Sequence, residues 1–579
     1  MNALAIRRLS TDILILGAGG AGLFAALHAQ QADPSLAITI AVKGLLGKCG
    51  CTRMVQGGYN VALGAGDSVE RHFMDTVEGG AWLPDQELVW TLVTGAVERV
   101  RELENELGCF FDRNPDGTLH QKAFAGQTFD RTVHKGDLTG IEIMNRLSEA
   151  VWARGIRRLE EHRVHALIKS ADGAAIAGAL LIDMRTGEYV FVSARAVLLA
   201  TGGGPTMYKF YTPSGDKSCD GLAMALAAGL PLRDMEMVQF HPTGLLAGPA
   251  TRMTGTVLEE GLRGAGGYLL DGAGRRFMID ADPRAERATR DIVSRAIFAE
   301  MRAGRTTPHG GVYLSMAHLG AENVRRQFKG MVERCADCGF DLAGDKVEVV
   351  PTAHYMMGGV EFAPDGRTEL SGLFVAGEDA GGVHGANRLG GNGVANSTVF
   401  GGIAGTTMSA WLEREGEFRT PDGIALEAAI DGAEAFFAAP AGRGDFESIR
   451  ERLHTTMWDD AGIVRDGAGL ARADGALAAL SVELETYAPV PACRDRAFNL
   501  HWHDWLNLKS LVAVSRVIVC AAQARENSRG AHYRADFPDA GDLARSTYTR
   551  VRLREGNLVS SAIPVRFTRV RPGESLLAA

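Results

Sequence analysis

The sequence predicts an α/β protein in which a Rossmann-like domain is interrupted by an α+β insertion and followed by a C-terminal helical bundle. Three observations support this fold class. A buried strand runs into a glycine-rich turn at 17–22, and the same strand–glycine pattern returns at 196–204 and 372–378. Residues 424–526 are helical in pattern almost throughout. The segment 245–350 changes character, with short strands, charged helices and many arginines, and we interpret it as the insertion.

The turn at 17–22 (GAGGAG) has the G-x-G-x-x-G spacing of a dinucleotide site. Gly17 permits the tight bend, Gly19 lets a pyrophosphate approach the backbone, and Gly22 allows close helix–strand packing. The following helix offers free N–H groups and the positive end of its dipole. A buried glycine-rich turn without a nucleotide is the alternative interpretation.

The second strand, at 37–42, is followed by Lys43, where an NAD site has its ribose-binding acid. This departure argues against NAD and leaves FAD. The remaining elements follow from hydrophobic periodicity. We expect helices at 68–78, 86–107, 140–154 and 220–229, strands at 163–168, 175–182 and 189–192, and a hairpin within 548–570.

Composition describes an ordinary globular protein of two to four domains, with 579 residues, 46% of them hydrophobic, and a net charge of −9. A pI near 6.0 gives no reason to expect nucleic acid as a partner. The eight cysteines are scattered and no signal peptide is evident, so we expect reduced thiols and a cytoplasmic protein. No run of 18 apolar residues exists, so no membrane span is expected.

Two patterns could suggest a metal ion, and neither is convincing. Cys335 and Cys338 have CxxC spacing but no second pair. His501 and His503 are two apart in a helical segment, and their side chains would diverge. We expect no metal site.

A set of short motifs occurs in one order over nearly the whole chain. They are residues 56–58 (QGG), 200–203 (ATGG), 220–221 (DG), 239–244 (QFHPTG), 260–263 (EGLR), 289–291 (TRD), 354–359 (HYMMGG), 377–378 (GE), 384–389 (HGANRL) and 528–533 (SRGAHY). Together with the glycine turn, they resemble the succinate dehydrogenase/fumarate reductase flavoprotein family, which includes L-aspartate oxidase.

The resemblance implies an FAD-binding domain at 1–244 and 355–412, a capping domain at 245–354, a helical domain at 424–540 and a C-terminal tail with the hairpin at 541–579. It also completes the cofactor site, because Glu378 and Lys43 resemble the residues that hold FAD and Asp220 resembles a ribose contact. The expected FAD-contacting residues are Gly17, Gly19, Gly20, Gly22, Lys43, Cys51, Thr52, Gln56, Gly57, Gly58, Thr201, Gly202, Asp220, Glu378 and Asn392.

The activity implied is that of an FAD-dependent oxidoreductase, which interconverts a C4 dicarboxylate, plain or substituted, and its unsaturated form. A hydride passes to or from flavin N5, and Arg290 matches the arginine that moves the proton. Glu260 and Arg263 resemble a relay that re-protonates Arg290. The alternative for Arg290 is a surface salt bridge with Asp291.

The expected substrate contacts lie at both ends of the dicarboxylate. Arg388 and His354 resemble the groups that hold one carboxylate, and a guanidinium suits bidentate binding. His241 matches the residue that polarises the other end. All of these assignments rest on the motifs, because a lone histidine is usually a core residue.

Three positions depart from the family pattern. Cys51 stands where succinate- and fumarate-converting relatives have a histidine bonded to the flavin, so we expect noncovalent FAD, with an S-cysteinyl link at Cys51 as the alternative. Glu259 replaces a threonine that hydrogen-bonds a substrate carboxylate. Either the substrate carries a donor at that end, or Glu259 points away. Gly393 follows Asn392 where relatives usually have a serine near the flavin.

The chain beyond 533–538 resembles the complex-forming members. We therefore expect its electron partner to be an iron–sulfur subunit, and we expect placement at the cytoplasmic face of a membrane through partner subunits. Two other functions stay open. One is an L-aspartate-oxidase-like enzyme that uses O₂ or fumarate. The other is a flavin-binding protein without turnover.

Overall fold

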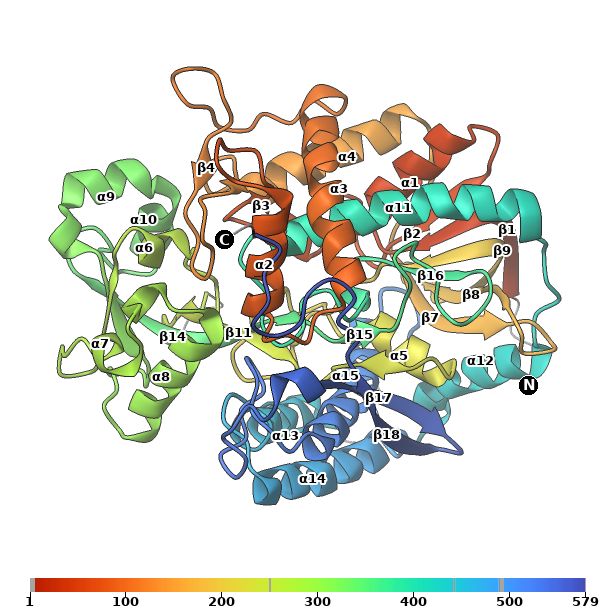
Figure 1. Ribbon diagram of the computed structural model, residues 1–579. Helices are drawn as coiled ribbons and strands as arrows, with labels where there is room; N and C mark the ends of the chain where they lie inside the picture. The colour runs from red at the N-terminus through yellow and green to blue at the C-terminus, as the bar shows by residue number, and fades with distance from the viewer. Residues whose placement is uncertain are drawn as a thin grey trace.

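The central layer of the molecule is a seven-stranded sheet, seen at the right of Figure 1 in a computed structural model that describes residues 6–577 except 249–250, 252, 441, 443, 488 and 490–493. Cys493 lies outside the described residues. The strand order is β6-β2-β1-β9-β8-β7, and β16 pairs with the end of β9. These strands are β1 (Ile6–Leu16), β2 (Ile38–Ala41), β6 (Arg157–Leu159), β7 (His162–Lys169), β8 (Ile176–Asp183), β9 (Tyr189–Leu199) and β16 (Leu373–Val375).

Strand β9 pairs with three other strands of this sheet. It pairs in parallel with β1 along one edge, and on its other edge with antiparallel β8 first and parallel β16 last. The sequence predicted two strands here, at 189–192 and from 196 onward, and this was wrong. Ser193 and Arg195 point to partly exposed positions while their neighbours are buried, so one long strand continues through them.

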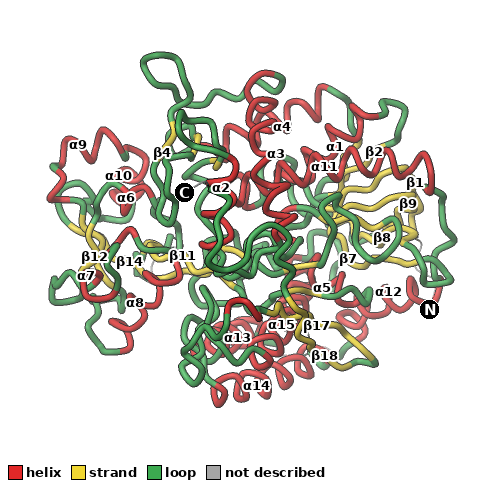
Figure 2. The backbone as a smooth tube through the Cα atoms, in the orientation of Figure 1, coloured by secondary structure: helices red, strands yellow, loops and turns green. Residues whose placement is uncertain are grey.

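Helices α1 (Gly20–Ala32) and α11 (Asn392–Glu415) cover one face of the sheet and pack along each other (Figures 1 and 2). Their backbones come very close, because a Cβ added at Gly405 would lie 2.3 Å from the carbonyl oxygen of Ala25. Only glycine permits this approach. The neighbouring elements on this side are α2 (Val69–Gly79), α3 (Gln86–Asn105), α4 (Thr139–Ala153), β3 (Tyr59–Asn60), β4 (Gln121–Lys122) and β5 (Thr132–Val133).

The insertion is an α+β unit, at the left of Figure 1, with a hydrophobic core of its own that runs from Leu245 to Val349. Its antiparallel sheet has the order β11-β14-β13-β12. The elements are β11 (Val238–Leu245), β12 (Tyr268–Leu270), β13 (Val312–Ser315), β14 (Lys346–Met356), α6 (Gly261–Gly264), α7 (Met278–Ala281), α8 (Arg290–Arg302), α9 (Ala321–Gln327) and α10 (Lys329–Ala336). Strands β11 and β14 cross the predicted domain boundaries, which stay predictions.

The C-terminal helices do not have a separate core, since their apolar side chains belong to the same buried cluster as the central sheet. They are α12 (Gly423–Ala438), α13 (Phe446–Asp459), α14 (Gly467–Glu485) and α15 (Leu500–Ala524). The hairpin predicted near the C-terminus is present, and its first strand pairs with β10. That sheet consists of β10 (Leu232–Arg233), β15 (Gly359–Val360), β17 (Thr547–Arg554) and β18 (Asn557–Pro564), beside α5 (Asp220–Ala227).

Among the described residues, helix α15 alone is long and apolar enough to cross a bilayer by length and composition. Two thirds of its most apolar stretch, 67%, is buried inside the protein. It packs against α14, α5 and both strands of the C-terminal hairpin. The helix therefore serves as a core element of this fold.

A buried charge cluster ties the end of α15 to the central domain. Arg525 donates to Glu236 Oε1 at 2.6 Å and to Asp234 Oδ1 at 3.3 Å, and all three side chains are almost fully buried. Burial raises the pKa of Asp234 to about 6, against the lowering effect of Arg233. Arg525 is therefore the ion-pair partner of Glu236, and it shares Asp234 with Arg233, which lies 3.2 Å from Asp234 Oδ2.

Replacing this guanidinium tests the cluster. We expect Arg525→Met to lower the unfolding free energy by about 3–5 kcal/mol, because it leaves the buried carboxylate of Glu236 without an ion-pair partner and Asp234 with Arg233 alone. Urea denaturation followed by circular dichroism measures the loss. The control is Arg552→Met, which removes the half-exposed ion pair with Glu369 and should cost about 0–1 kcal/mol. Equal losses for the two variants would contradict the prediction.

Candidate active site

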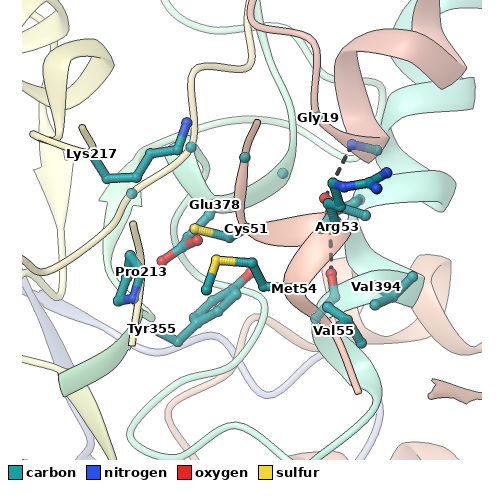
Figure 3. Close-up of a pocket in the computed structure, with 18 of the residues that line it drawn as sticks. Gly19, Cys51, Arg53, Met54, Val55, Pro213, Lys217, Tyr355, Glu378 and Val394 are labelled. Atoms are coloured by element: carbon teal, nitrogen blue, oxygen red, sulfur yellow. Dashed lines mark hydrogen bonds between the residues drawn. The ribbon is translucent and has the colours of Figure 1, made fainter. Parts of the chain in front are cut away.

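One cavity of about 560 Å³ lies where the strands of the central sheet end, between α11 and the insertion. This is the edge at which open α/β sheets bind ligands. Of the residues predicted for cofactor, catalysis and substrate, all but Gly22, Arg263 and Asn392 line it. Figure 3 shows residues from distant parts of the chain around the same space, among them Gly19, Lys217 and Val394.

The glycine turn forms one wall of the cavity. Gly17 has φ of +114°, and a Cβ there would lie 2.0 Å from the carbonyl oxygen of Ala200. At Gly19, by contrast, the nearest atom to an added Cβ is Thr52 Oγ1 at 3.6 Å, so the space in front of it is open. The amide of Gly20 donates to the same Oγ1 at 3.1 Å. The turn thus offers an open cradle at a helix N-terminus, which fits a pyrophosphate.

A charged network holds the next part of the cavity wall. Lys43 Nζ donates to Asp220 Oδ2 at 3.0 Å and to Asn507 Oδ1 at 3.1 Å. Arg163 binds the other oxygen of Asp220 at 2.7 Å. Although burial alone would raise it, Arg163 and Lys43 hold the pKa of Asp220 well below its ordinary value. Asp220 is therefore a fixed carboxylate at the edge of the cavity, suited to accept hydrogen bonds from a ribose.

Glu378 lines the cavity from the short 3₁₀ turn Gly377–Asp379 that follows β16. Its Oε1 accepts hydrogen bonds from the amides of Met356 at 2.9 Å and Gly204 at 3.4 Å. Burial raises the pKa of Glu378 to about 7. Next to it, Asp379 accepts hydrogen bonds from the backbone and hydroxyl of Thr201. These carboxylates fix the glycine-rich segment that follows β9.

Cys51 begins a short 3₁₀ turn at Cys51–Met54, and its sulfur faces the carboxylate of Glu378 in Figure 3. Burial, and then the charge of Glu378, raises the pKa of the Cys51 thiol to about 12. At neutral pH this side chain is a thiol, the form that does not act as a nucleophile. Its environment therefore disfavours a covalent bond at this position.

Three buried charges form a chain beside the cavity. Glu260 Oε2 accepts from Arg290 Nη2 at 2.7 Å, and its Oε1 accepts from Arg263 Nη2 at 2.9 Å. Burial alone would raise the pKa of Glu260, but the two guanidiniums outweigh it and hold the pKa below its ordinary value. Arg290 is also bound to Gln239 Oε1 at 2.9 Å. The alternative partner, Asp291, pairs with Arg295 instead, at 3.3 Å.

Two histidines, His241 and His354, face the cavity near these three charged side chains, with ring centroids 5.3 Å apart. Burial and the charge of Arg290 hold the pKa of His241 and of His354 well below the ordinary value, so both rings are neutral. His241 Nδ1 accepts from the amide of Thr243 at 3.3 Å, which places the proton on Nε2. Thr212 Oγ1 lies 2.8 Å from His354 Nδ1.

Arg388 completes this end of the cavity. Its guanidinium lies 4.5 Å from the ring centroid of Tyr355 and is buried, with Nε lacking a hydrogen-bond partner. Burial, and then repulsion by Arg290, lowers the pKa of Arg388 to about 10. It remains a cation at neutral pH, and among the described residues no carboxylate forms an ion pair with it. An anionic ligand would supply the missing partner.

Three predicted site residues, Gly22, Arg263 and Asn392, lie outside the cavity lining. Gly22 packs against the turn, where an added Cβ would lie 2.1 Å from the carbonyl oxygen of Gly17. Arg263 lies behind Glu260 and is fully buried. The side chain of Asn392 points away from the cavity to His72 Nε2 at 2.9 Å, so the structure does not support it as a flavin contact.

Several lining or supporting residues were not assigned from the sequence. Gln239 and Tyr355 lie inside quoted motifs and had a signal. Asn507, Lys122 and Thr212, which contact Lys43, Glu259 and His354, come from segments with no pattern of their own. The missed residues are Lys122, Arg163, Thr212, Ser218, Gln239, Tyr355, Asp379 and Asn507.

Comparison with known proteins is consistent with this geometry. A family model described as an FAD binding domain matches residues 12–394, and one described as the fumarate reductase flavoprotein C-terminus matches residues 450–576. One subunit of the fumarate reductase (CoM/CoB) of Methanothermobacter marburgensis is 40% identical over 542 residues, which cover 91% of this chain and 94% of that protein. The fumarate reductase flavoprotein subunit of Mycobacterium tuberculosis is 35% identical and covers 97% of this chain and 98% of its own length.

Solved structures agree over nearly the full length. The E. coli quinol fumarate reductase protein FrdA superimposes with a TM-score of 0.91 at 32% identity, covering 98% of this chain and 99% of that one. Mycobacterium smegmatis Sdh1 gives a TM-score of 0.85 at 35% identity, covering 98% and 96%. FAD is therefore the cofactor of this chain, and the open glycine cradle, helix N-terminus and fixed Asp220 of the cavity fit that cofactor.

The open space at Gly19 gives a test of the cofactor site. We expect Gly19→Ala to fold, since Gly19 has φ of −78° and an added Cβ meets no close atom. It should nevertheless weaken FAD binding at least about tenfold, or 1.4 kcal/mol, because the methyl group occupies the approach of the pyrophosphate. Titration of the apoprotein with FAD, followed by flavin fluorescence, measures the affinity. Unchanged affinity would contradict this placement, and Gly17→Ala, which should destabilise the fold itself, is the comparison.

Proposed function

The chain belongs to the succinate dehydrogenase/fumarate reductase flavoprotein family and is an FAD-dependent oxidoreductase of that type. From this premise we propose that it interconverts a C4 dicarboxylate, plain or substituted, and its unsaturated form. The observation that carries the proposal is the buried guanidinium of Arg388, a cation without a carboxylate partner among the described residues, facing the same cavity as Arg290. The cavity at this end has the charge and the donors to hold a small organic acid.

Arg388 and His354 are proposed to hold one carboxylate of the substrate. A guanidinium can give two parallel hydrogen bonds to a carboxylate, and burial strengthens them. His354 adds a single N–H, because Thr212 occupies its Nδ1 and the ring is neutral. His241 presents its Nε2–H from the neighbouring strand, and we assign it to the opposite end of the substrate.

The proton is assigned to Arg290. When bound, FAD exchanges a hydride with the substrate at its N5 atom. Arg290 faces the cavity and gives or takes the proton on the adjacent carbon, while Glu260 and Arg263 connect it inward. The fixed negative charge of Glu260 holds Arg290 in place and stabilises its protonated form between turnovers.

The activity is tested in both directions with the purified holoenzyme. Under anaerobic conditions, reduced methyl viologen should be oxidised when fumarate is added, and succinate should reduce an artificial acceptor dye. Absence of turnover in both directions, with these acids and with their monoamides alike, would refute the proposal. Hydrogen peroxide released with L-aspartate would point instead to an aspartate-oxidase-like enzyme.

We propose further that FAD is held without a covalent bond and that an iron–sulfur subunit carries the electrons. The Cys51 thiol is in its unreactive form, and the relatives are named as subunits. Exposed apolar side chains at Met54 and Leu138 line the cavity, where a partner could cover them. Acid precipitation should leave the yellow colour of FAD in the supernatant. A complex isolated from the source organism through this chain should contain iron and acid-labile sulfide, contributed by the partner subunit.

The proton shuttle gives the sharpest test of the assigned residues. Arg290→Gln should lower the turnover number about 10²–10⁴-fold, because the donor of the proton is lost. Bound FAD and its chemical reduction by dithionite should be retained. The control Arg284→Gln removes an exposed arginine of the same segment, paired with Asp282, and should leave turnover unchanged. A loss of less than tenfold in Arg290→Gln would assign the proton to another group.

A further inference from the structure

Two consecutive glutamates line the same end of the cavity, and their carboxylates have opposite environments. Glu260 uses both oxygens, one for each flanking arginine. Glu259 lines the cavity and is only 3% exposed, and its Oε2 is enclosed by protein without a well-formed hydrogen bond. Buried carboxylates are normally fully hydrogen-bonded, since an unpaired one carries a large desolvation cost. A ligand in the cavity would therefore meet Glu259 through its other oxygen, Oε1, in a carboxylate that the protein itself leaves poorly satisfied.

The nearest charge does not satisfy Glu259. Lys122 Nζ lies 3.5 Å from Oε2, an ion-pair distance that is long for a hydrogen bond, and it donates to the carbonyl oxygen of Gly136 at 2.9 Å. Asp137 and Arg334 are the other charged residues that act on Glu259. Burial, partly offset by Lys122, raises the pKa of Glu259. The residue is poised to accept hydrogen bonds and poorly suited to face a second anion.

Another part of the cavity lining offers a positive charge and N–H donors instead of a carboxylate. Arg388 is a cation without a carboxylate partner among the described residues, and His354 beside it is a neutral donor. An acid held there by one carboxylate leaves its other end toward His241 and Glu259. A second carboxylate at that end would meet the carboxylate of Glu259, and like charges in contact are costly.

We propose that Glu259 selects substrates whose end remote from Arg388 carries a hydrogen-bond donor, a carboxamide, hydroxyl or ammonium group, in place of a second carboxylate. This inference rests on the proposed function and names its substrate class. The reaction is otherwise the same. The double bond is lost as one alkene carbon gains a hydride and the other gains a proton from Arg290. Two reduced viologens supply the electron pair, and the solvent supplies both the hydrogen of the hydride and the proton that restores Arg290.

The test uses two probes of nearly identical shape, fumarate and its monoamide, fumaramate. With reduced methyl viologen as donor, the wild-type holoenzyme should show kcat/KM at least tenfold higher for fumaramate. Isothermal titration of the oxidised holoenzyme, which cannot turn these compounds over, should show the same order in Kd. Repeating it in buffers of different ionisation enthalpy should show proton uptake with fumarate only, because Glu259 must be protonated to accept a carboxylate.

Variants at Glu259 separate recognition from general damage. Glu259→Thr and the isosteric Glu259→Gln both put a donor in place of the carboxylate, so the fumaramate-to-fumarate ratio should fall at least tenfold. Glu348→Gln is the control, since this buried glutamate of the same unit pairs with His309 outside the cavity lining and should leave the ratio unchanged.

Each outcome has a distinct meaning. If fumarate is turned over and binds as well as fumaramate, or if the ratio is unchanged in both Glu259 variants, the inference is wrong while the proposed function stands. If neither probe is reduced, the proposed function itself fails.

Discussion

The arrangement of the site depends on one buried carboxylate, Glu260, held between Arg263 and Arg290. Helix α8 begins at Arg290, where the helix dipole disfavours a cation, and all three side chains are almost fully buried. Without Glu260 the two guanidiniums would be buried with no carboxylate between them, so its charge is what allows both to be buried. This requirement fixes the short segment at 260–264 against the start of α8 and aims the guanidinium of Arg290 at the cavity.

Much of the fold was predictable because it follows local rules. The turn at Gly17 needs glycine for its backbone angle, and the C-terminal helices have clear periodicity. The site was predictable where motifs carried it, as at Arg290 and Arg388. Its supporting contacts were not, because Lys43 meets Asn507 and Glu259 meets Lys122 across distant segments that only the tertiary fold brings together. The single strand β9 was missed because Ser193 and Arg195 interrupt its apolar pattern.

The insertion differs from the C-terminal helices in how it contacts the rest of the chain. The C-terminal helices share one hydrophobic core with the central sheet, whereas the insertion has its own. The insertion also meets the rest of the chain through polar contacts, Glu259 with Lys122 and Arg295 with the carbonyl oxygen of Gly530. Polar contacts of this kind exchange partners more easily than a packed core does. Filling of the cavity and the position of the insertion are therefore linked.

The pairing of β16 with β9 has a consequence for how the protein is made. The first sheet is incomplete until residues 373–375 leave the ribosome, and β10 waits for β17, near the end of the chain. At about 5–20 residues per second, the 173 residues between Leu199, at the end of β9, and Leu373, at the start of β16, leave this apolar sheet edge incomplete for roughly 9–35 s during synthesis. The nascent polypeptide must be shielded over that interval, so translation speed and chaperone supply govern the yield of folded protein as much as its final stability does.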